Sequence, residues 1–147
     1  MQISHIAAIV VASVLGLDAL IHVYWLTGRV WPARDTRALS QAVLNADVPF
    51  TPRVLLPLVL VLTIGGTAVL ARADLVHTGL PSWVLAASAG AVALGLLARG
   101  LAGVAWIVGI GASRETPFYW LNLTAYTPVC LVLSVAAGIV AMHPGTA

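Results

Sequence analysis

The chain alternates between long runs of apolar residues and shorter polar stretches. Four runs are almost free of charged residues, and we expect each of them to form one long helix, over residues 3–26, 54–72, 83–110 and 120–142. A helix needs about 20 mostly apolar residues to cross about 30 Å of hydrocarbon, and each run reaches or approaches this length. The pattern therefore predicts an all-α fold, an integral membrane bundle of four transmembrane helices.

A long polar stretch, residues 27–52, separates the first two runs. Asp35 and Thr36 are residue types that cap the start of a helix, so we expect a short helix after them. Its apolar side would be formed by Leu39, Ala42 and Val43, with Arg37, Ser40 and Gln41 elsewhere. The pattern predicts an interfacial helix at the headgroup boundary, and a lid over a site in the cytoplasmic leaflet is the alternative.

The composition supports a membrane protein. Of 147 residues, 61% are hydrophobic and only 8% are charged, whereas about 25% of a soluble domain is charged. The length fits a single domain over residues 1–147. The first run lacks a basic start and contains Asp18 and His22, so we expect a retained helix and not a cleaved signal peptide.

The distribution of arginines predicts the orientation. The chain has no lysine, and most of its arginines lie in or beside the loops after the first and third runs: Arg29, Arg34, Arg37, Arg53 and Arg114. Only Arg72 follows the second run. Because cytoplasmic loops are enriched in basic residues, we expect these two loops in the cytoplasm and both termini outside. No basic cluster suggests nucleic acid as a partner.

Charged and polar residues inside the apolar runs are the candidate chemistry. Asp18, His22, Trp25 and Arg29 recur at helical spacing, which would place them on one face of the first helix. Arg99 lies at a similar depth in the third helix. A central aspartate or arginine costs about 2.5–3.5 kcal/mol on insertion scales, so we predict that Asp18 and Arg99 compensate each other as an intramembrane ion pair.

Small and polar residues also recur every four positions in the last two runs. Ala91, Gly95, Arg99 and Gly103 predict a groove on the third helix that a neighbouring helix can approach closely. On the fourth helix, Asn122, Tyr126 and Cys130 share a face. The candidate pocket in the cytoplasmic half is therefore lined by Asp18, His22, Trp25, Arg99, Trp106, Asn122 and Tyr126.

Simpler explanations remain open for each feature. The polar residues could form a structural network that fixes the register of four helices, and most tryptophans could form an aromatic belt. His5, His77 and His143 lie near the outer face, but they lack the close spacing of known metal sites. His22 has no histidine partner on another helix for haem. We therefore expect no cofactor and no metal.

Two stretches resemble a known family. HVYWLTGRVWP (His22 to Pro32), Arg99 and FYWLNLTAYTPVC (Phe118 to Cys130) resemble the small four-helix bacterial membrane proteins grouped as domain of unknown function 3995. The chain departs from that pattern at Arg29, where the family has a second glycine, and at Asn122, where it has an acidic residue. The resemblance implies four crossings of a bacterial membrane, which we expect to be the inner membrane, and no agreed activity.

The sequence leaves several functions open. Asp18 and His22 could handle protons beside Arg99 as an anion or carbonyl anchor, in a bundle that binds or modifies a lipophilic small molecule or lipid. One acidic residue in the first of four helices also resembles, in outline, small proton-coupled transporters. A third alternative is a structural or accessory subunit. The bilayer is the expected partner, and homo-oligomers and enzymatic activity remain open.

Overall fold

The computed structural model describes residues 2–111 and 114–143. It is helical throughout its regular parts, with the elements α1 (Gln2–Leu26), α2 (Thr36–Leu44), α3 (Pro52–Arg72), α4 (Ser82–Ile107), α5 (Pro117–Leu121), the π-helix η1 (Asn122–Tyr126) and α6 (Thr127–Met142). The first residue and the last four of the predicted domain, 1–147, lie outside the described residues. Within the described part, the predicted all-α fold is confirmed.

Four segments are long and apolar enough to cross a membrane, as the sequence predicts. They are α1, α3, α4 and the continuous segment Pro117–Met142, which contains α5, η1 and α6. Large apolar side chains point outward on every side of the bundle, and Leu20 of α1 and Val132 of α6 are 67% and 65% exposed. Helices that are apolar all round but only partly buried need a nonpolar surrounding, which a bilayer supplies.

Glycines with left-handed backbone follow the ends of two spans, and α4 ends earlier than the apolar pattern indicates. α4 ends at Ile107, because Gly109 and Gly111 follow with φ of 95° and 77°. α1 ends at Leu26, two residues before Gly28, whose φ is 82°. Arg29 therefore lies beyond α1, and the prediction that it shares a helix face with Asp18 is wrong.

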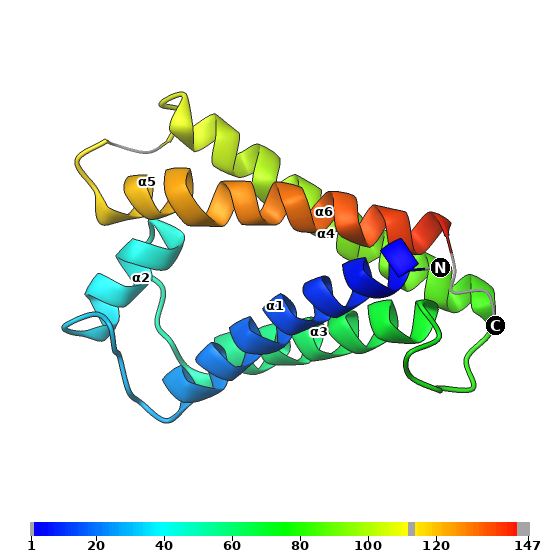
Figure 1. Ribbon diagram of the computed structural model, residues 1–147. Helices are drawn as coiled ribbons and strands as arrows, with labels where there is room; N and C mark the ends of the chain where they lie inside the picture. Colours follow the sequence, from blue (N-terminus) through cyan, green and yellow to red (C-terminus); the bar gives the residue numbers. More distant parts are fainter. Residues whose placement is uncertain (1, 112–113, 144–147) are drawn as a thin grey trace.

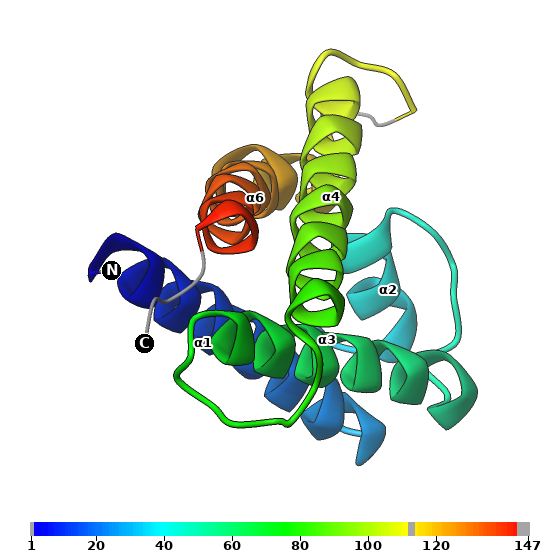
Figure 2. The ribbon, with the colours of Figure 1, turned by 90° about the vertical axis from the view of Figure 1, so that its right-hand side faces the viewer.

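The spans form two pairs that diverge along the bundle. α1 packs along α3, and α4 packs along α6, whereas α1 makes at most marginal contact with α4. Figure 1 shows the two pairs close together at the end that carries both chain ends and apart at the end that carries α2, which we call the α2 end. Seen along the bundle, α4 diverges furthest from α1 and α3 (Figure 2).

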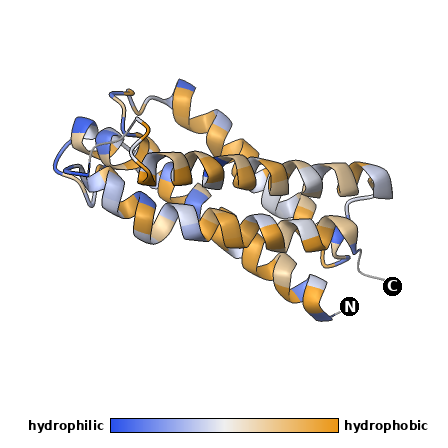
Figure 3. Cartoon of the chain, turned by 90° about the horizontal axis from the view of Figure 1, so that it is seen from above, coloured by the Kyte–Doolittle hydropathy of each residue, from blue (hydrophilic) through white to orange (hydrophobic). Residues whose placement is uncertain are grey.

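The shared core occupies only the half of the bundle opposite the α2 end. It joins all four spans through small and branched side chains: Ala7, Ala8, Val11, Leu15, Val69, Ala73, Ala89, Leu133, Ala137 and Val140. Beyond Leu15 on α1 and Ala89 on α4, towards the α2 end, neither helix contributes a residue to this buried set. The more hydrophilic segments gather at the α2 end (Figure 3).

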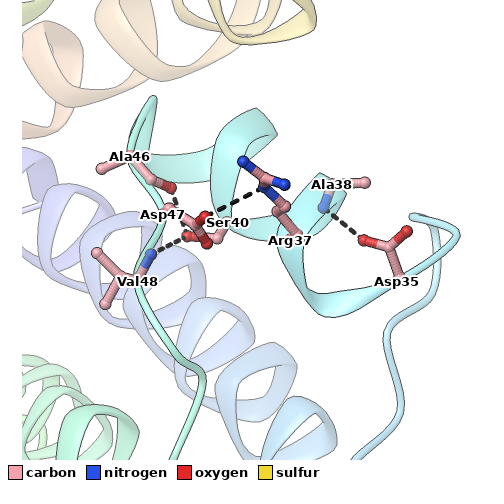
Figure 4. A network of polar contacts seen from close by, with 7 residues as sticks. All are labelled: Asp35, Arg37, Ala38, Ser40, Ala46, Asp47 and Val48. Carbon is pink, nitrogen blue, oxygen red and sulfur yellow. Dashed lines mark hydrogen bonds and ion pairs between the residues drawn. The ribbon is translucent and has the colours of Figure 1, made fainter.

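The short helix α2 is fixed by side-chain hydrogen bonds to the backbone (Figure 4). The Oδ1 atom of Asp35 accepts a hydrogen bond from Ala38 N at 2.8 Å, which confirms Asp35 as the N-cap. Ser40 is fully buried although it is polar. Its hydroxyl donates to Ala46 O at 2.6 Å and accepts from Val48 N at 2.8 Å, and these bonds turn the chain back towards α3.

α2 lies across the end of the bundle and touches both helix pairs. Leu39 packs with Trp25 of α1 and Leu55 of α3, while another side of α2 packs against α5. Asn45, which ends α2 in a left-handed conformation, donates its Nδ2 hydrogen to Gly111 O at 3.0 Å. The predicted helix in loop one is therefore present, and it bridges the diverging pairs.

Arg72 ties three helices together at the opposite end. It ends α3, donates from Nη2 to the Ala141 carbonyl in the last turn of α6 at 3.2 Å, and donates from Nη1 to Ser82 Oγ at the start of α4 at 3.1 Å. A cation beside a helix C-terminus is favoured by the helix dipole, and the last carbonyls of a helix lack intrahelical donors. Arg72 therefore supports the end where the core is continuous.

We expect Arg72→Gln to destabilise the bundle by about 1–2 kcal/mol, because charge-assisted hydrogen bonds to α4 and α6 are lost. The measurement is reversible unfolding by SDS in mixed micelles. Arg53→Gln is the matched control, since Arg53 at the start of α3 is exposed and has no hydrogen bond or ion pair with other described residues. Equal effects of the two substitutions would contradict this role.

Candidate functional site

Arg99 is the centre of a polar group between α4 and the start of the last span. It is half-buried, and its Nη1 donates to Asn122 Oδ1 at 3.2 Å. The guanidinium also lies over two aromatic rings, 5.0 Å from the centroid of Trp106 on the same helix and 5.7 Å from that of Tyr126 in η1. Cation–π contacts of this kind partly replace the hydration of the charge.

Asn122 is held rigidly by three hydrogen bonds. Its side chain is fully buried, and its Nδ2 donates to the Gly103 carbonyl of α4 at 2.9 Å. Its Oδ1 accepts from Thr127 Oγ1 at 3.2 Å as well as from Arg99. Since every polar atom of the Asn122 side chain has a partner, the amide fixes the position of the Arg99 guanidinium relative to α6.

The last span is not one regular helix, because Asn122–Tyr126 forms a π-helical turn. The backbone N–H of Thr127 donates to Asn122 O, five residues earlier. Pro128 explains the wide turn: a proline inside a helix lacks a donor and clashes with the carbonyl four residues before it. π-Helical turns inside α-helices occur often at functional sites. The apolar pattern of the sequence does not indicate this turn, and Pro128 is the signal that could have revealed it.

α4 approaches the last span through two glycines near Arg99. An added Cβ at Gly103 would overlap Thr127 Oγ1 and come within 3.1 Å of Asn122 Oδ1, and one at Gly100 would lie 2.6 Å from Leu131 Cδ2. In contrast, a Cβ at Gly95 would meet nothing within 4 Å. The predicted small-residue groove is therefore wrong for its outer part, because the close contact with α6 runs through Gly100 and Gly103.

Asp18 and His22 form a second polar group on α1. His22 Nδ1 lies 2.7 Å from the backbone oxygen of Asp18 and 3.3 Å from its carboxylate Oδ1. Both neighbours are acceptors, so Nδ1 carries the ring proton. His22 is buried, whereas 48% of the Asp18 side chain is exposed. The carboxylate therefore keeps room for another partner.

The predicted ion pair between Asp18 and Arg99 is absent from the described residues. No described carboxylate oxygen lies within 4.0 Å of an Arg99 nitrogen, and Asp18 contacts His22 one turn away instead. The physical reason is the divergence of the bundle, which separates α1 from α4 at this depth. The last span packs against both α1 and α4.

Trp25 has a different environment from the other predicted site residues. Its ring packs edge-on to His22 with the centroids 4.9 Å apart, but it also contacts Phe50 at 5.5 Å and donates from Nε1 to Trp31 O at 3.2 Å. Trp25 therefore anchors loop one and α2. Thr127 and the Gly103 backbone also contribute to the site, although they were not among the predicted residues.

The seven predicted residues thus fall into two groups. Arg99, Trp106, Asn122 and Tyr126 are joined on α4 and η1, while Asp18, His22 and Trp25 are joined on α1. Among the described residues, no group of three or more His, Cys, Asp or Glu side chains could hold a metal ion. The arrangement offers one fixed cation, one accessible carboxylate and aromatic surfaces, which suit binding of a polar group within a membrane.

The fold and the polar group define a small multi-pass helical membrane protein with a charged centre inside its spans. The chain belongs to a family of proteins of unknown function, DUF3995, whose family model matches residues 15–137. The match covers α3 and α4 in full, part of the first and last spans, and both polar groups. No curated protein and no solved structure matches the chain.

We expect Gly103→Ala to destabilise the bundle by about 1–3 kcal/mol, because overpacking displaces the Thr127 hydroxyl from Asn122. Gly95→Ala on the same helix is the control, and it should leave stability unchanged or raise it by up to about 1 kcal/mol through helix propensity. Thermal unfolding in detergent, followed by circular dichroism, measures both. A Gly103→Ala protein as stable as the Gly95→Ala protein would contradict the close approach.

Proposed function

We propose that this membrane protein binds an amphipathic small molecule or lipid, with Arg99 as the anchor for its polar group. The proposal is based on how few partners the Arg99 side chain has. Its guanidinium lies inside a membrane span, has one hydrogen bond to the described chain and has no described carboxylate within 4.0 Å. A ligand acceptor is the natural complement of such a group.

The energetics of arginine in a membrane support this proposal. A guanidinium presents five N–H donors, and an arginine at the centre of a span costs about 2.5–3.5 kcal/mol on insertion scales. Asn122 and the rings of Trp106 and Tyr126 offset part of this cost. An anionic or carbonyl group would satisfy donors that the chain leaves over, and planar, paired acceptors match the guanidinium best.

The apolar surroundings provide for the rest of such a molecule. The shared core ends before the level of Arg99, so the residues buried between all four spans do not reach this depth. Leu123 and Val129 are exposed apolar side chains three residues before and after Tyr126, whose ring contacts the Arg99 guanidinium. A hydrocarbon tail can lie against these side chains while its polar end reaches Arg99.

Proton-coupled transport is a second candidate, and Asp18 favours it. An arginine paired with Asp18 would keep the carboxylate ionised, which suits a proton carrier poorly. Arg99 is not bound to Asp18, and the Asp18 side chain is half exposed. A carboxylate in this setting can exchange a proton for a cationic substrate.

We also propose that the protein lies in a bacterial inner membrane with the α2 end in the cytoplasm. The arginine-rich loops lie at that end, and cytoplasmic loops carry the excess of basic residues. α2 would then lie in the cytoplasmic headgroup region and cover the end of the bundle between the diverging pairs.

Labelling of single cysteines tests this orientation. In a Cys130→Ser background, a membrane-impermeant maleimide added to intact cells should label Thr78→Cys, in the exposed loop between α3 and α4, but not Ala46→Cys beside α2. Both positions are exposed and uncharged, so neither change disturbs the arginine distribution. Labelling of Ala46→Cys alone would show the opposite orientation.

Native mass spectrometry of the protein released from mild detergent, with a visible absorption spectrum beside it, tests binding at Arg99. We expect the wild-type protein to retain an additional mass that is lost in Arg99→Leu, because the apolar side chain removes every donor of the anchor. Arg53→Leu, at the exposed start of α3, is the control and should retain the mass.

A wild-type chain that carries nothing would contradict the binding proposal and favour the transporter, with Asp18 as its proton-carrying group. An additional mass that persists in Arg99→Leu would place the ligand elsewhere. Circular dichroism of each variant confirms that the comparison is made between folded proteins.

A further inference from the structure

Asp18 and Arg99 lie at matching depth on opposite helix pairs. Each is eight residues before the end of its helix, Leu26 for α1 and Ile107 for α4, and both helices run towards the α2 end. At 1.5 Å per residue, both charges lie about 12 Å from their helix ends. The structure therefore presents one negative and one positive group at one level of the membrane, separated from each other.

Neither charge is neutralised by the described chain. The neighbour of Asp18 is His22, which is charged only when it is protonated, and Arg99 bonds to the uncharged amide of Asn122. The last span packs against both helices, α4 and α1, and its Tyr126 ring contacts the Arg99 guanidinium. A ligand that lies against the last span at this level can reach both charged helices.

This arrangement restricts the charge of the ligand. An anion at Arg99 would be repelled by the nearby carboxylate, and a cation at Asp18 would be repelled by the guanidinium. A molecule with one group of each sign complements both residues. Building on the proposed function, we infer that the site binds a zwitterionic lipid whose phosphate contacts Arg99 and whose ammonium group contacts Asp18.

The depth of the site supports a lipid from the adjacent leaflet. α4 has 26 residues and is about 39 Å long, so it exceeds about 30 Å of hydrocarbon by about 9 Å. If the excess is shared between both ends, Arg99 starts about 8 Å inside the hydrocarbon boundary. A long side chain can direct its charged head towards the boundary, where lipid phosphates lie.

The partners of the two charges favour a primary ammonium group over a trimethylammonium group. The accessible carboxylate of Asp18 accepts charge-assisted hydrogen bonds, which only an ammonium with N–H donors can provide. A quaternary ammonium is recognised mainly by aromatic cages. The aromatic rings of this site, Trp106 and Tyr126, already contact the Arg99 guanidinium.

The experiment is native mass spectrometry of the full chain from nanodiscs that contain equal amounts of phosphatidylethanolamine, phosphatidylcholine and phosphatidylglycerol. We expect phosphatidylethanolamine to be retained about tenfold over each of the others, the ratio that one charge-assisted hydrogen bond provides. Asp18→Asn should reduce this preference to near one while lipid is still retained. Arg99→Leu should reduce retention of all three lipids.

Two further variants keep the test independent of folding. Asp18→Glu preserves the carboxylate and should restore the preference, and Asp47→Asn changes an exposed loop carboxylate and should leave it intact. Retention of phosphatidylglycerol or phosphatidylcholine at equal or higher levels would overturn the inference, and so would a preference that survives in Asp18→Asn. Retention without this selectivity leaves the proposed function standing, whereas a bare wild-type chain contradicts both.

Discussion

The three hydrogen bonds of Asn122 are the constraint on which the α2 end of this bundle depends. A buried amide in a membrane must satisfy both its donor and its acceptor within the protein, because hydrocarbon offers no substitute. Asn122 does so by reaching the Gly103 backbone on α4, the Thr127 hydroxyl after the π-helical turn and the Arg99 guanidinium. The same bonds require glycine at position 103 and fix the charge that defines the site.

Much of the fold could be predicted from the sequence, because hydrophobic length in a membrane allows few alternatives. The four spans, the short helix in loop one and its Asp35 cap followed from apolar run length and residue type. The end of α4 at Ile107 could not be placed, since the left-handed glycines after it and not hydropathy determine it.

The candidate site was predicted less completely, because its geometry depends on how helices diverge. Periodicity grouped Asn122 with Tyr126 on one helix, whereas depth along the helices joined Arg99 to them and also paired Asp18 with Arg99. Sequence spacing gives the position of a residue along a helix and around it, but it does not give the distance between two helices. To predict the π-helical turn, Pro128 had to be considered together with the polar residues before it. A regular four-residue spacing hides the extra residue that a π-helical turn contains.

Because the shared core occupies only one half of the bundle, the two ends of α4 differ in how easily they open. Around Ala89, α4 is packed into a core that all four spans build, so its amide hydrogens can exchange only when the whole bundle opens. Around Trp106, the same helix is held chiefly by the last span, and there exchange requires only that these two segments separate. α4 is thus held rigidly near Ala89, whereas near Trp106 it can separate from the last span while the rest of the bundle stays folded.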